Sequence, residues 1–88
     1  MKTQFHYVYV LKSLKDQLFY LGYSRDVDQR VIDHNQGKNV STKYRRPLEL
    51  IFFEAFLSKT DALRRENYFK TTKGKTTLRQ MLREYLNK

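Results

Sequence analysis

Three apolar runs along the chain have the composition of β-strands. Residues 5–11, 17–23 and 48–56 are rich in β-branched and aromatic side chains, and a polar break at residues 12–16 separates the first two. Two such runs around a short break predict a β-hairpin, and the third run is apolar enough for a central strand. Pro47 precedes the third run and predicts the end of an irregular segment, because the residue before proline favours extended backbone.

A helix is predicted between the second and third strands. Asp26, followed three residues later by Gln29, is typical of a helix N-terminus, and Gly37 provides a stop after about Asn35. Helical spacing places four side chains on one face, namely Val27, Arg30, Val31 and His34. Two of the four are apolar, and the other two are able to bind phosphate.

Two further helices are predicted after the third strand. Ser58 or Thr60 caps the first, which runs to about Lys70, and Gly74 separates it from the second. The last helix carries an amphipathic stripe, formed by Leu78, Met81, Leu82, Tyr85 and Leu86. The element order is therefore ββαβαα. A hairpin and a third strand covered by helices belong to the α/β (α+β) class.

The register of the predicted hairpin decides which residues share a face. With a two-residue turn at Leu14 and Lys15, Tyr9 pairs with Tyr20, and both phenol rings project from one face of the sheet. If the first helix packs on that face, the two phenols and the polar residues of the helix form a polar pocket instead of a core.

Composition narrows the function classes. The single expected domain, residues 1–88, carries 18 Lys and Arg against 9 Asp and Glu, and its net charge of +9 indicates a polyanionic partner. With 40% hydrophobic and 15% aromatic residues the chain is not disordered by composition, and no apolar run approaches the ~20 residues of a membrane span. It has no cysteine and no apolar signal-peptide segment, so we expect a cytoplasmic protein.

Glu66 is a carboxylate in an unexpected place. It lies three or four residues from Ala62, Leu63 and Phe69, the apolar residues of the inner face of the second predicted helix. Burial of an unpaired carboxylate is costly or raises its pKa. A cation such as Arg30 or a divalent metal would justify the position, and spacing alone leaves the structural ion pair and the metal ligand equally open.

An irregular basic segment follows the first predicted helix. Residues 38–47 hold four cations, Lys38, Lys43, Arg45 and Arg46, together with several hydroxyl side chains. Such a segment suits phosphate contacts without base specificity, although charge runs are commonly just solvated. We take these four residues as candidate nucleic-acid contacts.

The ordered motifs of the chain resemble those of the GIY-YIG endonuclease superfamily. Tyr7-Val8-Tyr9 is followed after ten residues by Tyr20-Leu21-Gly22, then by Arg30, His34 and the tripeptide Arg64-Arg65-Glu66. The resemblance looks closest to the small stand-alone bacterial members, which are similar to the catalytic domain of an excinuclease. It implies a three-stranded antiparallel sheet flanked by helices, and hydrolysis of DNA phosphodiesters with one divalent metal ion.

The resemblance also implies a role for each motif residue. Tyr9 matches a tyrosine that activates or positions water, and Tyr20 matches a second tyrosine that shapes the site and holds phosphate or water. Gly22 lets the end of the strand approach the helix. Arg30 stabilises the charge that develops on the phosphate, and His34 supports the first tyrosine.

Glu66 matches the ligand of a single Mg²⁺ or Mn²⁺ ion, and one carboxylate implies weak metal binding without substrate. A neighbouring arginine and this metal would lower the pKa of Tyr9 from about 10. Tyr7 stands where the family has a glycine. The family's later asparagine has no convincing match in Asn67 or Asn87, so that role stays empty.

Together these features predict a metal-dependent DNA endonuclease that acts in DNA repair or processing. A non-catalytic nucleic-acid-binding module with the same fold is the alternative, although a pure binder has no need of Tyr9, Tyr20, Arg30 and Glu66. A basic protein that binds a membrane surface or RNA through its last helix is a second alternative, but core packing explains that helix more simply. DNA is the expected partner and a membrane is not, while a homodimer or a partner protein is left open as the source of specificity.

Overall fold

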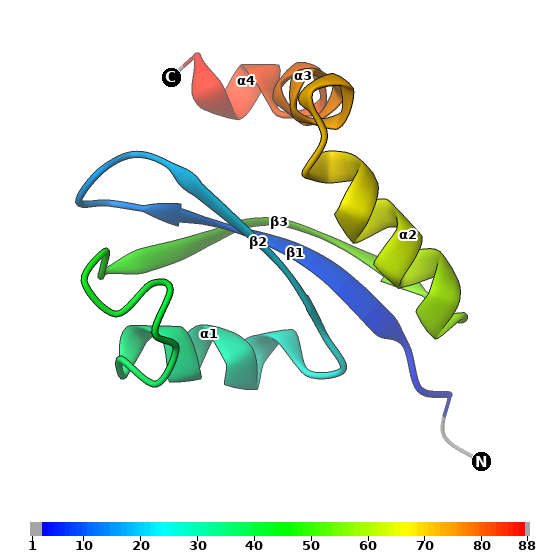
Figure 1. The fold of residues 1–88 in the computed structure, drawn as a ribbon, viewed down its shortest axis with the longest axis horizontal. Helices are drawn as coiled ribbons and strands as arrows, with labels where there is room; N and C mark the ends of the chain where they lie inside the picture. The colour runs from blue at the N-terminus through cyan, green and yellow to red at the C-terminus, as the bar shows by residue number, and fades with distance from the viewer. Residues whose placement is uncertain (1–2, 88) are drawn as a thin grey trace.

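The computed structural model describes residues 3–87. Its elements are β1 (His6–Ser13), β2 (Phe19–Ser24), α1 (Val27–Asn35), β3 (Leu48–Phe56), α2 (Lys59–Phe69), α3 (Thr72–Met81) and α4 (Arg83–Leu86). The strands form one antiparallel sheet in the order β2-β1-β3, so the prediction of a central third strand is wrong: β1 is central and β3 is an edge strand. Figure 1 shows α1 on one face of this sheet and α2, α3 and α4 on the other. The predicted fold class is confirmed.

The central strand β1 serves two apolar clusters, because its side chains alternate between the two faces of the sheet. Val8 and Val10 project toward α2 and α3, while Tyr9 and Leu11 project toward α1. The first cluster also contains Ala62, Phe69 and Leu78, and the second also contains Val27 and Leu48. Tyr9 therefore lies on the same side of the sheet as α1.

The hairpin register differs from the prediction by two residues. The connecting loop spans residues 14–18 instead of two residues, so Tyr9 pairs with Gly22 and Leu11 pairs with Tyr20. A shift of two residues keeps every side chain on its predicted face, because side chains alternate with a period of two. The Tyr9 and Tyr20 rings still share the α1 side of the sheet, with centroids 6.5 Å apart.

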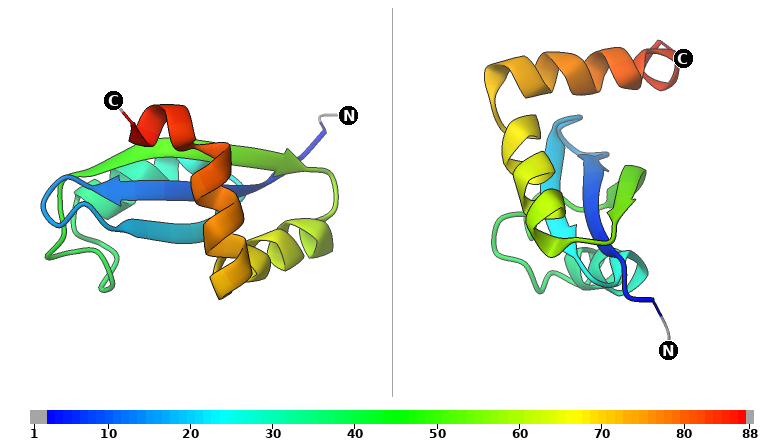
Figure 2. Two further views of the ribbon diagram at one scale, coloured as in Figure 1. Left: turned by 90° about the horizontal axis from the view of Figure 1, so that it is seen from above. Right: turned by 90° about the vertical axis from the view of Figure 1, so that its right-hand side faces the viewer.

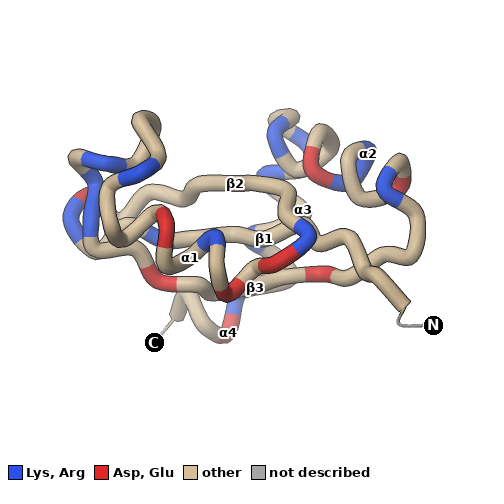
Figure 3. Tube along the Cα trace, turned by 90° about the horizontal axis from the view of Figure 1, so that it is seen from below, with Lys and Arg blue, Asp and Glu red and all other residues tan. Residues whose placement is uncertain are grey.

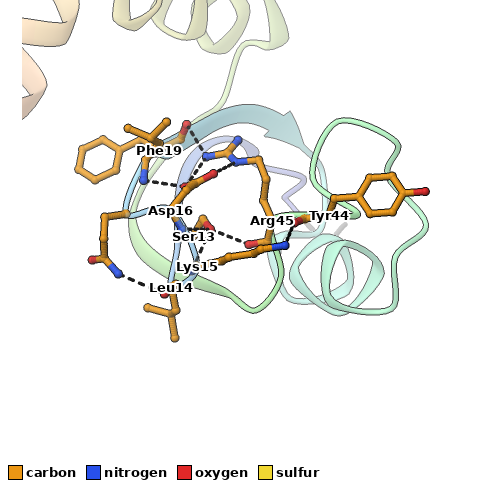
Figure 4. Close-up of polar contacts among 9 residues, drawn as sticks. Ser13, Leu14, Lys15, Asp16, Phe19, Tyr44 and Arg45 are labelled. Atoms are coloured by element: carbon orange, nitrogen blue, oxygen red, sulfur yellow. Dashed lines mark hydrogen bonds and ion pairs between the residues drawn. The ribbon is translucent and has the colours of Figure 1, made fainter.

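A polar cluster ties the β1–β2 loop to the basic segment that follows α1 (Figure 4). The buried Ser13 hydroxyl accepts hydrogen bonds from the backbone N–H groups of Lys15 and Asp16, and it donates to the carbonyl oxygen of Arg45. Nε of Arg45 donates to the Asp16 carboxylate at 2.7 Å, and this hydrogen bond is the largest of the causes that lower the pKa of Asp16 to about 2. The cluster holds the basic segment against the hairpin.

The ends of α1 form as predicted. The Asp26 carboxylate accepts a hydrogen bond from the backbone N–H of Gln29, and Gly37, with φ of 79°, follows the last turn. The Asn35 side chain binds both the N–H and the C=O of Leu48, at 2.8 and 2.9 Å. These two hydrogen bonds fasten the C-terminal end of α1 to the start of β3.

The junction between α2 and α3 differs from the prediction. Ser58 caps α2 as expected, but α3 begins at Thr72 with Thr71 as its N-cap, so Gly74 lies inside the helix. A Cβ at Gly74 would be 1.7 Å from the carbonyl oxygen of Tyr68. Glycine therefore lets α3 pack against the end of α2 and cross above the sheet, as Figure 2 shows, and it does not end a helix.

The predicted last helix is divided in two. α3 ends at Met81 and α4 begins at Arg83, with Leu82 at the break. Of the predicted stripe, Leu78 is buried and Leu82 packs against the same cluster, while Met81 is exposed. Within residues 3–87 the structure has no helix that is both long and apolar enough to cross a bilayer.

Substitution of Gly74 tests the close approach of α3 to α2. A glycine-to-alanine change in a helix interior usually stabilises a protein, by roughly 0.5–1 kcal/mol. We expect the opposite sign for Gly74→Ala, with a loss of about 1–3 kcal/mol in the free energy of unfolding, because the added methyl group overlaps backbone atoms. Urea denaturation followed by circular dichroism measures the change.

Thr76→Ala is the matched control, because Thr76 is exposed on the same helix. Its free energy of unfolding should change by less than about 0.5 kcal/mol. If Gly74→Ala is as stable as the wild type or more stable, the helices do not approach each other as closely as described.

Candidate active site

The Tyr9 ring lies across Gly22 on the neighbouring edge strand. The two residues are partners in the sheet, and a Cβ at Gly22 would be 2.4 Å from both Cζ and the hydroxyl oxygen of Tyr9. Any side chain at this position would displace the phenol. The expectation that Gly22 lets the strand approach the helix is therefore corrected, because the close neighbour is the Tyr9 ring.

A buried chain of three polar side chains links β1, α1 and the basic segment. The Tyr9 hydroxyl lies 3.0 Å from Nε2 of His34, and Nδ1 of His34 lies 2.7 Å from the Thr42 hydroxyl. Tyr9 is 1% exposed, and His34 and Thr42 are fully buried. This geometry fits a neutral imidazole. Its Nε2 accepts a hydrogen bond from the Tyr9 hydroxyl, and its Nδ1–H donates a hydrogen bond to the Thr42 hydroxyl.

Burial dominates the protonation states in this chain of residues. Desolvation lowers the pKa of His34, Arg30 lowers it further, and Asp33 opposes the shift. Desolvation likewise raises the pKa of Tyr9 above its usual value, Tyr20 adds to the rise, and Arg30 opposes it. Arg30 lowers the pKa of Tyr9, as predicted, but burial raises this pKa by more. Both His34 and Tyr9 are therefore neutral at pH 7.

Tyr20 and Arg30 lie beside the buried chain. The Tyr20 ring packs edge-on against the His34 ring at a centroid distance of 4.9 Å. Arg30 is exposed on α1, and none of the ion pairs found within residues 3–87 involves its guanidinium. An exposed guanidinium in this position can bind a phosphate group. The structure thus brings together Tyr9, Tyr20, Arg30 and His34.

Glu66 approaches this group from α2. Its side chain is 14% exposed and pairs with Nζ of Lys70, one helical turn later, at 3.2 Å. The cation beside Glu66 is thus Lys70 and not Arg30, which the sequence offers as one example of a possible partner. The Glu66 charge contributes to the raised pKa of Tyr9, so the carboxylate lies within electrostatic reach of the phenol.

The Glu66 carboxylate is the kind of oxygen ligand that a hard divalent cation such as Mg²⁺ prefers. Within residues 3–87, no cluster of three or more His, Cys, Asp or Glu side chains is suited to hold a metal ion. Glu66 is the carboxylate whose charge helps to raise the pKa of Tyr9. Mg²⁺ retains several waters and takes oxygen ligands from substrate phosphates, so a site with one carboxylate fits a weakly held ion.

The four cations of the basic segment have different environments. Arg45 binds a carboxylate of the hairpin loop, and the Arg46 guanidinium donates to a backbone carbonyl of its own segment. Both arginines therefore brace the fold. Lys38 and Lys43 are exposed, and their partners are an ion pair at 3.7 Å and an aromatic ring at 5.2 Å. The two lysines are the members of the set with amines that face solvent.

Thr42 is the residue that sequence reasoning missed. It lies eight residues after His34, inside the segment interpreted as a phosphate-contacting loop. Its immediate neighbours are polar, so no local pattern marks it as buried. The contacts of Ser13, Asp16 and Arg45 hold the segment in the position where the Thr42 hydroxyl meets the imidazole.

Comparison with known proteins places this geometry in a family. Residues 5–80 match the GIY-YIG catalytic domain. The chain is 49% identical over 71 residues to UPF0213 protein YazA of Bacillus subtilis, which covers 80% of this chain and 71% of that protein. It is 45% identical over 67 residues to a UPF0213 protein of Staphylococcus saprophyticus, which covers 75% of this chain and 80% of that protein.

A solved structure shares the fold. The solution NMR structure of the UPF0213 protein BH0048 from Bacillus halodurans matches with a TM-score of 0.54 and 39% sequence identity, over 88% of this chain and 84% of that chain. The matched family region includes both tyrosine motifs, α1 and the helix that carries Glu66. The chain therefore belongs to the GIY-YIG family of nuclease domains, and its relatives within that family are the UPF0213 proteins.

Proposed function

We propose that the protein is a metal-dependent endonuclease that hydrolyses phosphodiester bonds in DNA. The observation that carries this proposal is the buried hydrogen-bonded chain Tyr9–His34–Thr42, with Arg30 and Glu66 near its phenol end. A module that only binds nucleic acid has no need of an imidazole held behind a phenol. The match to a family of nuclease domains supports the same class.

His34 and Tyr9 act together as the base in this proposal. Nε2 of His34 accepts the phenol proton, and the Tyr9 oxygen takes a proton from the attacking water. Thr42 holds the imidazole through Nδ1, which keeps the acceptor lone pair directed at Tyr9. Burial raises the pKa of Tyr9 and lowers that of His34, so a separate phenolate beside an imidazolium is unfavourable. The water proton therefore moves to the Tyr9 oxygen as the phenol proton moves to Nε2.

The remaining residues stabilise charge and hold the substrate. Arg30 neutralises the negative charge that grows on the phosphate, and Tyr20 orients a phosphate oxygen or the water. Glu66 would hold the Mg²⁺ or Mn²⁺ ion, which supplies Lewis-acid stabilisation of the phosphate and the leaving group. The net charge of +9 favours association with DNA, and the exposed Lys38 and Lys43 would contact its phosphates. Repair or processing of DNA is the cellular role that suits such an activity.

Removal of the Tyr9 hydroxyl tests the proposed base. Tyr9→Phe retains the ring over Gly22 and loses only the group that meets His34. We expect DNA binding to persist and cleavage to fall by about 10²-fold or more, the usual size of a general-base effect. Single-turnover kinetics measure the chemical step without interference from product release.

Tyr7→Phe is the matched control for this variant. Tyr7 lies two residues earlier on β1, about 6–7 Å along the strand, and its ring packs against Phe53 at 5.9 Å. The control should retain activity. Full activity in Tyr9→Phe would reassign the base to His34 or to the more exposed Tyr20, and an inactive Tyr7→Phe would show that the first motif is misplaced.

Glu66→Gln tests the metal ligand. The amide keeps the size of the side chain and loses the charge that a divalent ion needs, so cleavage should fall by about 10³-fold or more. The ion pair with Lys70 is partly exposed, and its loss should cost no more than about 1 kcal/mol of stability. A variant that unfolds, together with wild-type cleavage in EDTA, would identify Glu66 as a structural residue.

The pH dependence of stability tests the neutral state of His34. The pKa of His34 in the folded protein lies below the unfolded value of 6.5, so the unfolded chain binds more protons between the two values. This contribution is fully present above about pH 6.5, and stability falls as the pH drops through the window below it. Thermal unfolding at several pH values measures the slope.

His34→Gln should flatten this slope below pH 6.5, because the titrating group is gone. A wild-type slope in His34→Gln would mean that another group causes the pH dependence.

A further inference from the structure

A cleft of ≈ 370 Å³ opens between the edge strand β2 and helix α3. Residues of β2 and of the preceding loop form one wall. Three cations from the other side line it, namely Lys70 at the end of α2 and Lys75 and Arg79 on α3. Of the described residues that line the cleft, none is a carboxylate. The local charge is therefore strongly positive.

Two residues connect the cleft with the candidate active site. Tyr20 lines the cleft from the edge strand β2, and its ring lies on the α1 side of the sheet, where it contacts the His34 ring at 4.9 Å. Lys70 lines the cleft and pairs with Glu66 at 3.2 Å. A polyanion that occupied the cleft would thus lie next to the residues that act on the phosphodiester.

The lining combines cations with flat and apolar groups. The Arg79 guanidinium lies over the Phe19 ring at 5.2 Å, and Leu18 is 59% exposed at the same wall. No ion pair of Lys75 or Arg79 occurs within the described residues 3–87. Lysine and arginine bind phosphates, and a guanidinium plane or an aromatic ring stacks on a nucleobase. This lining suits a nucleotide better than an inorganic ion or an apolar ligand.

The size of the cleft distinguishes between forms of DNA. A volume of ≈ 370 Å³ is near the lower end for small-ligand pockets and fits about one nucleotide. A base-paired duplex presents its phosphates on a broad cylinder and keeps its bases stacked inside, so its bases do not reach such a cleft. Figure 3 shows Lys and Arg positions gathered in the segment after α1 and again around α2, at opposite ends of the β2 edge. A DNA strand that contacted both basic regions would run along the β2 edge, which carries Tyr20.

We propose that the cleft between β2 and α3 binds an unpaired nucleotide of the DNA strand, next to the phosphodiester that is cut. Lys75 and Arg79 contact the backbone phosphates, and the base stacks on the guanidinium that lies over Phe19. The inference rests on the proposed function, because it assigns the nucleotides that flank the cleaved bond. The substrate class is then single-stranded DNA, or a duplex with an unpaired segment.

Binding to fluorescein-labelled DNA in EDTA tests the cleft without cleavage. Fluorescence anisotropy compares a short single strand with the duplex of the same sequence, at several salt concentrations. The double variant Lys75→Gln/Arg79→Gln should bind the single strand about 10-fold more weakly or worse, and its log–log salt slope should flatten by about 1.4, since each phosphate contact on a single strand contributes about 0.7. The wild type should bind the single strand more tightly than the duplex.

Arg64→Gln/Lys73→Gln is the matched control, since it removes the same charge from exposed positions of α2 and α3 outside the cleft. It should leave the salt slope unchanged. Equal losses in the two double variants would overturn the cleft as a binding site, because net charge would then explain both. If the duplex binds as tightly as the single strand, the proposal that the cleft binds an unpaired nucleotide is overturned.

Arg79→Lys separates stacking from charge. The lysine keeps the positive charge and loses the planar guanidinium over Phe19, so affinity for the single strand should fall while the salt slope stays at the wild-type value. Unchanged affinity would overturn the stacking contact. Lys75→Gln alone should flatten the slope by about 0.7. This variant leaves the Arg79–Phe19 contact in place, so a loss of that packing contact cannot explain the change.

Cleavage assays of the wild type with Mg²⁺ or Mn²⁺ distinguish the inference from the proposed function. If the wild type cuts no DNA and the cleft variants still weaken single-strand binding relative to the control, the proposed endonuclease fails and the nucleotide site stands. If the wild type cuts DNA and the cleft variants bind like the control, the nucleotide site fails and the endonuclease stands.

Discussion

The Tyr9 hydroxyl reaches His34 because residue 22, its partner across the hairpin, has no side chain. The phenol lies flat over the edge strand and ends beside α1, where the imidazole meets it. Tyr20 then packs against the same imidazole from β2. The site thus depends on one contact between neighbouring strands, and a methyl group at Gly22 would be enough to displace its central residue.

Polar contacts far from the reacting groups complete this arrangement. Ser13, Asp16 and Arg45 hold the segment after α1 against the hairpin, and this segment carries Thr42 to the second nitrogen of His34. An arginine that the sequence pattern indicates as a phosphate contact therefore supports the imidazole indirectly. Surface charge and site geometry are coupled through the same ten-residue stretch, which explains why its cations differ so much in their partners.

The neutral pair Tyr9 and His34 is buried, whereas Arg30 is exposed to solvent. Burial keeps Tyr9 and His34 neutral, because desolvation disfavours the charged form of each side chain. Arg30 remains exposed on α1, where a phosphate can reach it, and Glu66 is held at the margin by Lys70. A single carboxylate with a lysine beside it would hold a divalent ion only weakly.

The sequence by itself determined the strands, α1 with its cap at Asp26, the shared face of Tyr9 with its partner tyrosine, and the family. These follow from side-chain alternation, local capping and ordered motifs, which are properties of nearby residues. Only the tertiary structure decided the hairpin register, the close contact at Gly74, the buried position of Thr42 and the structural role of Arg45. Each of these depends on a contact between segments that are far apart in the sequence. Local composition does not determine which distant residue packs against a given side chain.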